Sequence, residues 1–191
     1  MRHLWILRHG KAAADAPAGG GDAQRPLVAR GRADATRLGR RLAAGTGAFG
    51  LVDVPVPAIA LCSAAARTRE TADLVLGAMD AGLRLESYRS LYGASTGTVL
   101  GYVRELDDAV ASALVVGHNP AMFQLAWELV GPVPGVADDA PDGDDPDGDR
   151  AVLRSHGFPT CALAVVTLTV DRWEDVDAGR GALAGLFRPP Y

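Results

Sequence analysis

The sequence predicts an α/β fold in which a largely parallel sheet is covered by helices on both faces. Short apolar runs typical of strands alternate with longer segments whose apolar residues recur at helical spacing. Such alternation is typical of parallel sheets, because parallel strands are connected through helices. The chain has 191 residues, of which 48% are hydrophobic and 22% charged. That length suffices to bury a core, and we expect one domain over residues 1–191.

Five short apolar runs are predicted strands. They are residues 3–7, 59–62, 84–86, 113–116 and 162–170. The run at 84–86 has the weakest strand pattern, and the run at 162–170 is the longest.

Three segments are predicted amphipathic helices, since each carries apolar residues three and four positions apart. Their apolar faces consist of Ala35, Leu38 and Leu42 in a helix over 30–44, of Ala72, Val75, Leu76 and Met79, and of Phe123, Ala126, Trp127 and Val130. We expect these side chains to form the core of the fold rather than to line a cofactor site.

Two segments interrupt the alternation. Residues 12–23 are rich in Ala, Gly and Asp and are predicted to form a flexible loop. Residues 134–149 are acidic, broken by proline and without apolar periodicity, so they are predicted to be a mobile insertion. Their Asp-x-Asp spacing leaves a calcium site as an alternative, although it misses the EF-hand template.

The composition excludes several classes of partner and cofactor. A net charge of −4 gives no overall basic field for nucleic acid. No apolar stretch approaches the ~20 residues that span a bilayer, and the N-terminus lacks a signal-peptide pattern. Cys62 and Cys161 are too few for a disulfide framework and lack metal-ligand spacing. We therefore expect a cytoplasmic protein that uses no metal or other cofactor and binds neither nucleic acid nor membranes.

Candidate functional residues follow three of the predicted strands. Arg8 and His9 come directly after the first strand and are followed by Gly10. Arg67 lies shortly after the second strand, in the opening turn of a helix, and His118 follows the fourth. The carboxyl ends of parallel strands lie along one edge of the sheet, so these groups are expected to converge on one pocket. Considered alone, each of these arginines could also be a solvated surface residue, and each of these histidines a structural residue beside a turn.

The segment around His118 has a further interpretation. Asn119 is a favoured helix N-cap, and Pro120 is favoured at the first helical position. His118 is therefore predicted to lie just outside a helix N-terminus, where free N–H groups and the helix dipole favour anions.

Two arginines and two histidines around one point suit a phosphoryl group. The planar fork of arginine binds phosphate oxygens in pairs and stays charged. A histidine held between arginines is biased toward its neutral, nucleophilic form, because like charge lowers its pKa. A second histidine can donate to an oxygen on which charge develops.

The ordered motifs of the chain resemble the histidine phosphatase superfamily, which is phosphoglycerate mutase-like, and in particular its small phosphohistidine phosphatase (SixA-type) branch. The matching segments are LRHGKA at 7–12, RPLVARGRADATRLGRRLA at 25–43, SAAARTRETA at 63–72, LYGAS at 91–95, VVGHNPAM at 115–122, FPTCALAVVTL at 158–168 and LFRPP at 186–190. The resemblance implies a three-layer α/β/α sandwich. It also implies that His9 is phosphorylated during the reaction, with Arg8, Arg67 and His118 around the phosphate.

The general acid has no clear match in the sequence. Many members of the superfamily place a glutamate shortly before a motif like that at 91–93, whereas the nearby acid here is Glu86, displaced toward the strand. Glu86 is therefore a possible general acid or an exposed strand carboxylate. Arg25 is predicted to have a structural role, although its side chain could also reach the mouth of the pocket.

Together these observations predict a metal-independent phosphatase that acts through a covalent phosphohistidine intermediate. The chain lacks the large helical insertions of mutases and phytases, and an open pocket favours a bulky substrate such as protein phosphohistidine. Asn119 is expected to join Arg8, Arg67 and His118 in binding the substrate. A phosphatase of small phosphomonoesters such as sugar phosphates or nucleotides is the enzymatic alternative, and a non-catalytic phosphate-binding module is the alternative from another class.

Overall fold

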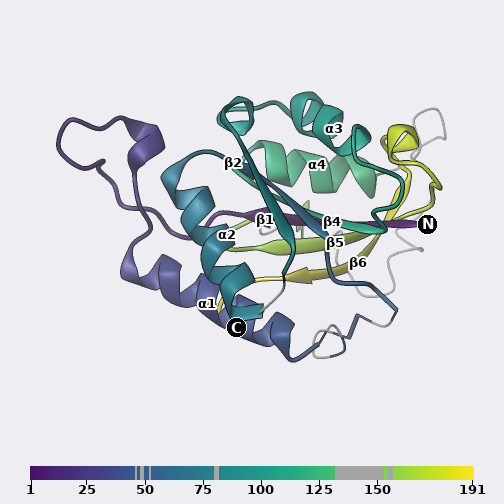
Figure 1. Ribbon diagram of the computed structural model, residues 1–191, viewed down its shortest axis with the longest axis horizontal. Helices are drawn as coiled ribbons and strands as arrows, with labels where there is room; N and C mark the ends of the chain where they lie inside the picture. The colour runs from purple at the N-terminus through teal and green to yellow at the C-terminus, as the bar shows by residue number, and fades with distance from the viewer. Residues whose placement is uncertain (46, 48–49, 52, 80–81, 132–152, 155–156) are drawn as a thin grey trace.

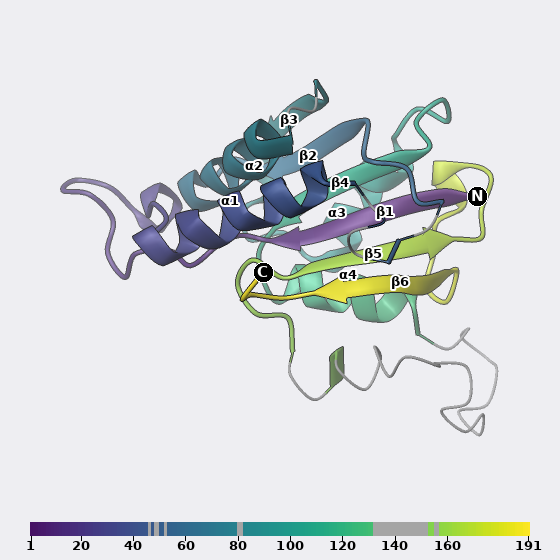
Figure 2. The same ribbon diagram turned by 90° about the horizontal axis from the view of Figure 1, so that it is seen from below.

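A six-stranded sheet forms the middle layer of the computed structural model, which describes residues 1–45, 47, 50–51, 53–79, 82–131, 153–154 and 157–191. The strands are β1 (Arg2–Arg8), β2 (Ile59–Ser63), β3 (Arg84–Tyr88), β4 (Ser112–Gly117), β5 (Leu163–Leu168) and β6 (Gly181–Phe187). Their order in the sheet is β3-β2-β4-β1-β5-β6, which can be followed in Figure 2. The first four strands in this order are mutually parallel, and β5 and β6 add two antiparallel pairings at the other side. The predicted mostly parallel sheet is confirmed.

Helices cover both faces of this sheet, as Figure 1 shows. Helices α1 (Ala29–Ala43) and α2 (Ala66–Met79) lie on one face, and α3 (Thr96–Arg104) and α4 (Ala121–Leu129) lie on the other. Short 3₁₀ turns occur at η1 (Asp22–Gln24), η3 (Arg89–Leu91) and η4 (Trp173–Asp175). The three-layer sandwich implied by the resemblance is therefore the observed architecture.

The alternation of side chains along β1 builds one core on each face of the sheet. Leu4 and Ile6 pack into the core beneath α3 and α4, whereas Trp5 and Leu7 pack into the core beneath α1 and α2. All four side chains are buried. Successive residues of a strand point to opposite faces, so a central strand covered on both sides is apolar throughout.

Two elements lie outside the sequence prediction. Helix α3 contains two glycines and two threonines in nine residues, which weakens its helical pattern, and Ser95 caps it by accepting a hydrogen bond from the N–H of Thr98. Strand β6 is rich in Gly and Ala, and it forms because antiparallel pairing with β5 stabilises it. The acidic segment at 134–149 lies outside the described residues. No helix in the part of the chain that the structure describes is long and apolar enough to cross a membrane.

Candidate active site

The parallel strands deliver the two histidines to one edge of the sheet. Arg8 is the last residue of β1 and His9 follows it, while His118 follows the end of β4, the neighbouring strand. The centroids of the two imidazole rings lie 5.1 Å apart. Arg67, in the first turn of α2, approaches from β2 on the other side of β4, and its side chain is buried.

Close packing between the loop after β1 and helix α1 fixes the backbone beside His9. A Cβ atom on Gly10 would come within 2.9 Å of the carbonyl oxygen of Gly31, and one on Gly31 would come within 2.3 Å of that of Lys11. The N–H of Gly10 also donates to the hydroxyl of Thr71 on α2, over 2.9 Å. Only glycine permits this approach, so the turn that carries His9 is held rigidly.

The imidazole of His9 is fixed in one tautomer by its neighbour in the chain. Its Nδ1 lies 2.7 Å from the carbonyl oxygen of Gly10. A carbonyl oxygen only accepts, so Nδ1 carries the proton and Nε2 keeps its lone pair. Burial lowers the pKa of His9 to about 4, opposed by the bond to Gly10 and reinforced by the charges of Arg67, Arg8 and Arg25. His9 is therefore neutral at pH 7, with Nε2 available as a nucleophile.

His118 is also neutral and is oriented by a serine at the end of β2. Its Nε2 lies 2.8 Å from Oγ of Ser63, which itself accepts a bond from the N–H of Ala65. Burial, reinforced by the nearby His9 and Arg67 and partly offset by Asp22, lowers the pKa of His118 to about 3. If Ser63 donates to Nε2, then Nδ1 carries the proton. Nδ1 is buried without a partner among the described residues, so in that tautomer its N–H is available to a substrate oxygen.

Arg8 and Asn119 are anchored by one carbonyl group. The carbonyl oxygen of Phe158 accepts from Nη1 of Arg8 at 2.6 Å and from Nδ2 of Asn119 at 2.9 Å. Burial lowers the pKa of the Arg8 guanidinium, which nevertheless remains charged. Asn119 does not cap α4 as predicted: Pro120 occupies the N-cap position, no side chain caps the helix, and the Asn119 amide is instead used to anchor the loop before β5.

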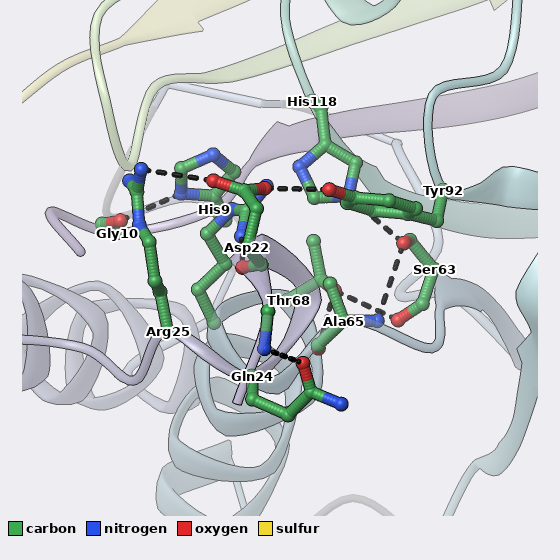
Figure 3. A network of polar contacts seen from close by, with 12 residues as sticks. His9, Gly10, Asp22, Gln24, Arg25, Ser63, Ala65, Thr68, Tyr92 and His118 are labelled. Atoms are coloured by element: carbon green, nitrogen blue, oxygen red, sulfur yellow. Dashed lines mark hydrogen bonds and ion pairs between the residues drawn. The ribbon is translucent and has the colours of Figure 1, made fainter. Parts of the chain in front are cut away.

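Arg67 is engaged by a carboxylate that the sequence analysis did not select. Its Nη1 donates to the backbone oxygen of Asp22 at 2.8 Å, and its Nη2 donates to Oδ2 of the same residue at 3.0 Å. The Asp22 carboxylate also accepts from Arg25 at 2.9 Å and from the hydroxyl of Tyr92 at 2.6 Å. Figure 3 shows this carboxylate between the Arg25 guanidinium and Tyr92, beside the two histidines. Hydrogen bonds from Tyr92 and Arg67 lower the pKa of Asp22, so it is ionised at pH 7.

Glu86 lies on the edge strand β3 and takes no part in this cluster. Its carboxylate pairs with Arg84 at 2.6 Å and accepts a hydrogen bond from the hydroxyl of Tyr88. No bond from Glu86 to either histidine is found among the described residues. The carboxylate that the structure brings beside the histidines is that of Asp22.

The site residues that were not selected from the sequence lie in loops or at the end of a strand. Tyr92 lies in the LYGAS segment, and its ring stands 5.6 Å from that of His118 and 5.7 Å from the guanidinium of Arg67. Ser63 closes β2, and Asp22 lies three residues before Arg25. The i, i+3 spacing of Asp22 and Arg25 was the available signal for their ion pair. Arg25 reaches the site, where it pairs with Asp22.

The chain is similar to known proteins in both sequence and structure. Residues 4–119 match the family model of the histidine phosphatase superfamily, branch 1. The chain is 35% identical over 185 residues to the uncharacterized protein Rv1276c of Mycobacterium tuberculosis, covering 96% of this chain and 99% of that one. It is 28% identical to a candidate phosphohistidine phosphatase SixA from Nakamurella multipartitia, with a TM-score of 0.75 over 100% of this chain and 97% of that one. The tungstate complex of the protein histidine phosphatase SixA is 26% identical, with a TM-score of 0.67 over 98% and 97% of the two chains.

Proposed function

The chain belongs to the histidine phosphatase superfamily, and we propose that it removes phosphoryl groups from protein phosphohistidine by way of a phosphorylated His9. The observation that carries the proposal is the state of His9. Its Nδ1 is bonded to Gly10 and burial holds the ring neutral, so Nε2 presents a lone pair among three arginines. A group that only bound phosphate would need the cations but not a histidine in this state.

In the proposed first step, Nε2 of His9 attacks phosphorus and the bond from phosphorus to the substrate's imidazole nitrogen breaks in line. Arg8 and Arg67 neutralise the phosphoryl oxygens, and Nδ1 of His118 donates to an oxygen on which charge develops. The substrate imidazole, protonated on its distal nitrogen, leaves as a neutral ring. Because fixed guanidinium groups supply the positive charge, the step requires no metal ion.

In the second step, water attacks the phosphorylated His9, the bond between Nε2 and phosphorus breaks, and inorganic phosphate leaves. The sum is hydrolysis of a P–N bond by one water molecule. His9 is left neutral, with its Nδ1 still bonded to Gly10, and is ready for another cycle. Asn119 is proposed to contact the substrate next to His118, through its buried Oδ1, an acceptor that has no partner in the part of the chain that the structure describes.

Two observations favour phosphohistidine over small phosphomonoesters. The similar structures at 28% and 26% identity carry SixA names. In addition, Glu86 is engaged away from the cluster, and Asp22 is ionised. An alkoxide leaving group needs a proton delivered as its bond breaks, whereas a protonated imidazole does not.

The test compares kcat/KM for a phosphohistidine peptide, an aryl phosphate and a sugar phosphate, all in the presence of a chelator. The proposal predicts the highest value for the peptide, with no turnover of any substrate by His9→Gln. A higher kcat/KM for the sugar phosphate would contradict the proposed substrate. Phosphate binding without turnover of any of the three would indicate a binding module instead.

A further inference from the structure

The site already contains an anion of its own. The Asp22 carboxylate accepts from Arg67, Arg25 and Tyr92, at 3.0, 2.9 and 2.6 Å. A fourth bond, from the other terminal nitrogen of Arg67, ends on the backbone oxygen of Asp22. The guanidinium fork that faces the histidines is thus occupied by one residue.

A carboxylate and a phosphoryl group make the same demands on such donors. Both present oxygen acceptors to the planar fork of arginine, and both accept strong, charge-assisted bonds. We propose that the Asp22 carboxylate is a built-in competitor, which the phosphoryl group of the substrate displaces from Arg67, Arg25 and Tyr92. Arg25 and Tyr92 are then phosphate-binding residues, and Asp22 sets the affinity of the site for phosphate. This inference rests on the proposed function, since it concerns the same site.

The charges around the site support this assignment. Three guanidinium groups, those of Arg8, Arg25 and Arg67, lower the pKa of His9, and both histidines are neutral. With Asp22 ionised, the net charge of these groups is +2, which the charge of a phosphate dianion balances. Without Asp22 they would sum to +3, and the product phosphate would be held more tightly. Asp22 therefore favours release of phosphate, at the cost of weaker binding of every anion.

The placement of Asp22 allows it to be displaced. The side chain of Asp22 is 49% exposed. Its carboxylate can therefore replace its bonds to arginine with bonds to water at little cost in free energy. It follows three successive glycines, and the segment that carries it projects beyond the sheet in both Figure 1 and Figure 2. Arg67, in contrast, is buried and held on α2, so the carboxylate rather than the cation is the group that moves.

The direct test is calorimetric titration of inorganic phosphate into the wild type and Asp22→Asn. The asparagine keeps the size of the side chain and removes its charge. We expect phosphate to bind about tenfold more tightly to Asp22→Asn. In this variant phosphate no longer has to break charge-assisted bonds between the arginines and a carboxylate before it binds them. Inhibition by product phosphate should strengthen by the same factor. Asp15→Asn, which removes an exposed carboxylate from the same segment, is the matched control and should bind phosphate as the wild type does.

A double-mutant cycle separates competition from a merely structural role. The Tyr92 hydroxyl can donate either to the Asp22 carboxylate or to phosphate. In the wild type, Tyr92→Phe removes this donor from both anions, so the affinity for phosphate should change little. In the Asp22→Asn background only phosphate loses that donor, and the same substitution should weaken binding several-fold. Equal effects of Tyr92→Phe in both backgrounds would overturn the proposal.

Other outcomes are equally decisive. Unchanged or weaker phosphate binding by a folded Asp22→Asn would overturn the inference. If that variant kept wild-type phosphate affinity and lost activity only on alkyl phosphates, Asp22 would deliver a proton instead. The titration needs no turnover, so a wild type that binds phosphate but hydrolyses nothing would refute the proposed function and leave this inference intact.

Discussion

The neutral state of His9 has a measurable consequence for stability. In the folded protein the pKa of His9 is about 4, against 6.5 for an ordinary histidine. Between these two values the unfolded chain binds a proton that the folded chain refuses, so the free energy of unfolding falls as pH falls. The contribution is intact above pH 6.5 and is lost progressively as pH drops toward 4.

The magnitude follows from the same two values. Each pKa unit corresponds to about 1.4 kcal/mol, so the full shift corresponds to about 3 kcal/mol. From pH 7 to pH 5, linkage predicts that His9 alone removes about 2 kcal/mol from the free energy of unfolding. His118, with a pKa of about 3, acts in the same direction in any variant that retains it.

The assay is urea unfolding of the wild type and His9→Gln at pH 8, 7 and 5. Glutamine does not titrate, so the wild type should lose about 2 kcal/mol more than His9→Gln between pH 7 and pH 5. The interval from pH 8 to pH 7 serves as an internal control, because there the difference between the two proteins should hardly change. Identical losses between pH 7 and pH 5 would refute a neutral, buried His9.

Substitutions at four further residues test other parts of the site. Arg67→Lys should reduce kcat/KM nearly as much as Arg67→Ala, since lysine keeps the charge but loses the fork that the site uses; retained activity in the lysine variant would show that a point charge suffices. His118→Ala should lower kcat more than it raises KM. Ser63→Ala should have the same effect to a smaller degree, because Ser63 orients the His118 ring. A change confined to KM would assign His118 to ground-state binding. Gly31→Ala should lower the melting temperature by several degrees, since the added Cβ would clash with the backbone of Lys11; an unchanged melting temperature would show that the contact relaxes freely.

The sequence sufficed for the features that local pattern determines. The apolar runs at β1, β2 and β4 define parallel strands, and parallel strands bring the residues at their ends together. Hence the sequence predicts that His9 and His118 converge, and their ring centroids lie 5.1 Å apart. Strand β6 and helix α3 escaped prediction because tertiary pairing and a serine cap, rather than periodicity, stabilise them.

The remainder of the site depends on paths that no local pattern specifies. Asp22 and Tyr92 are 70 residues apart and meet because two loops approach the same arginine. The direction of the Asn119 side chain depends on the carbonyl of Phe158, which lies 39 residues further along the chain. Glu86 is placed by the edge position of β3, where Arg84 and Tyr88 are its nearest polar partners.

Trapping of the phosphorylated intermediate shows whether His9 is the nucleophile. The protein would be mixed with a labelled phosphohistidine peptide, quenched within milliseconds in alkali, and mapped by peptide mass spectrometry, with His9→Gln as the control. We expect one phosphoryl group per chain, on the imidazole of His9, that is stable in alkali, lost in acid and missing from the control. A phosphoryl group on any other residue, or turnover by His9→Gln at the wild-type rate, would contradict it.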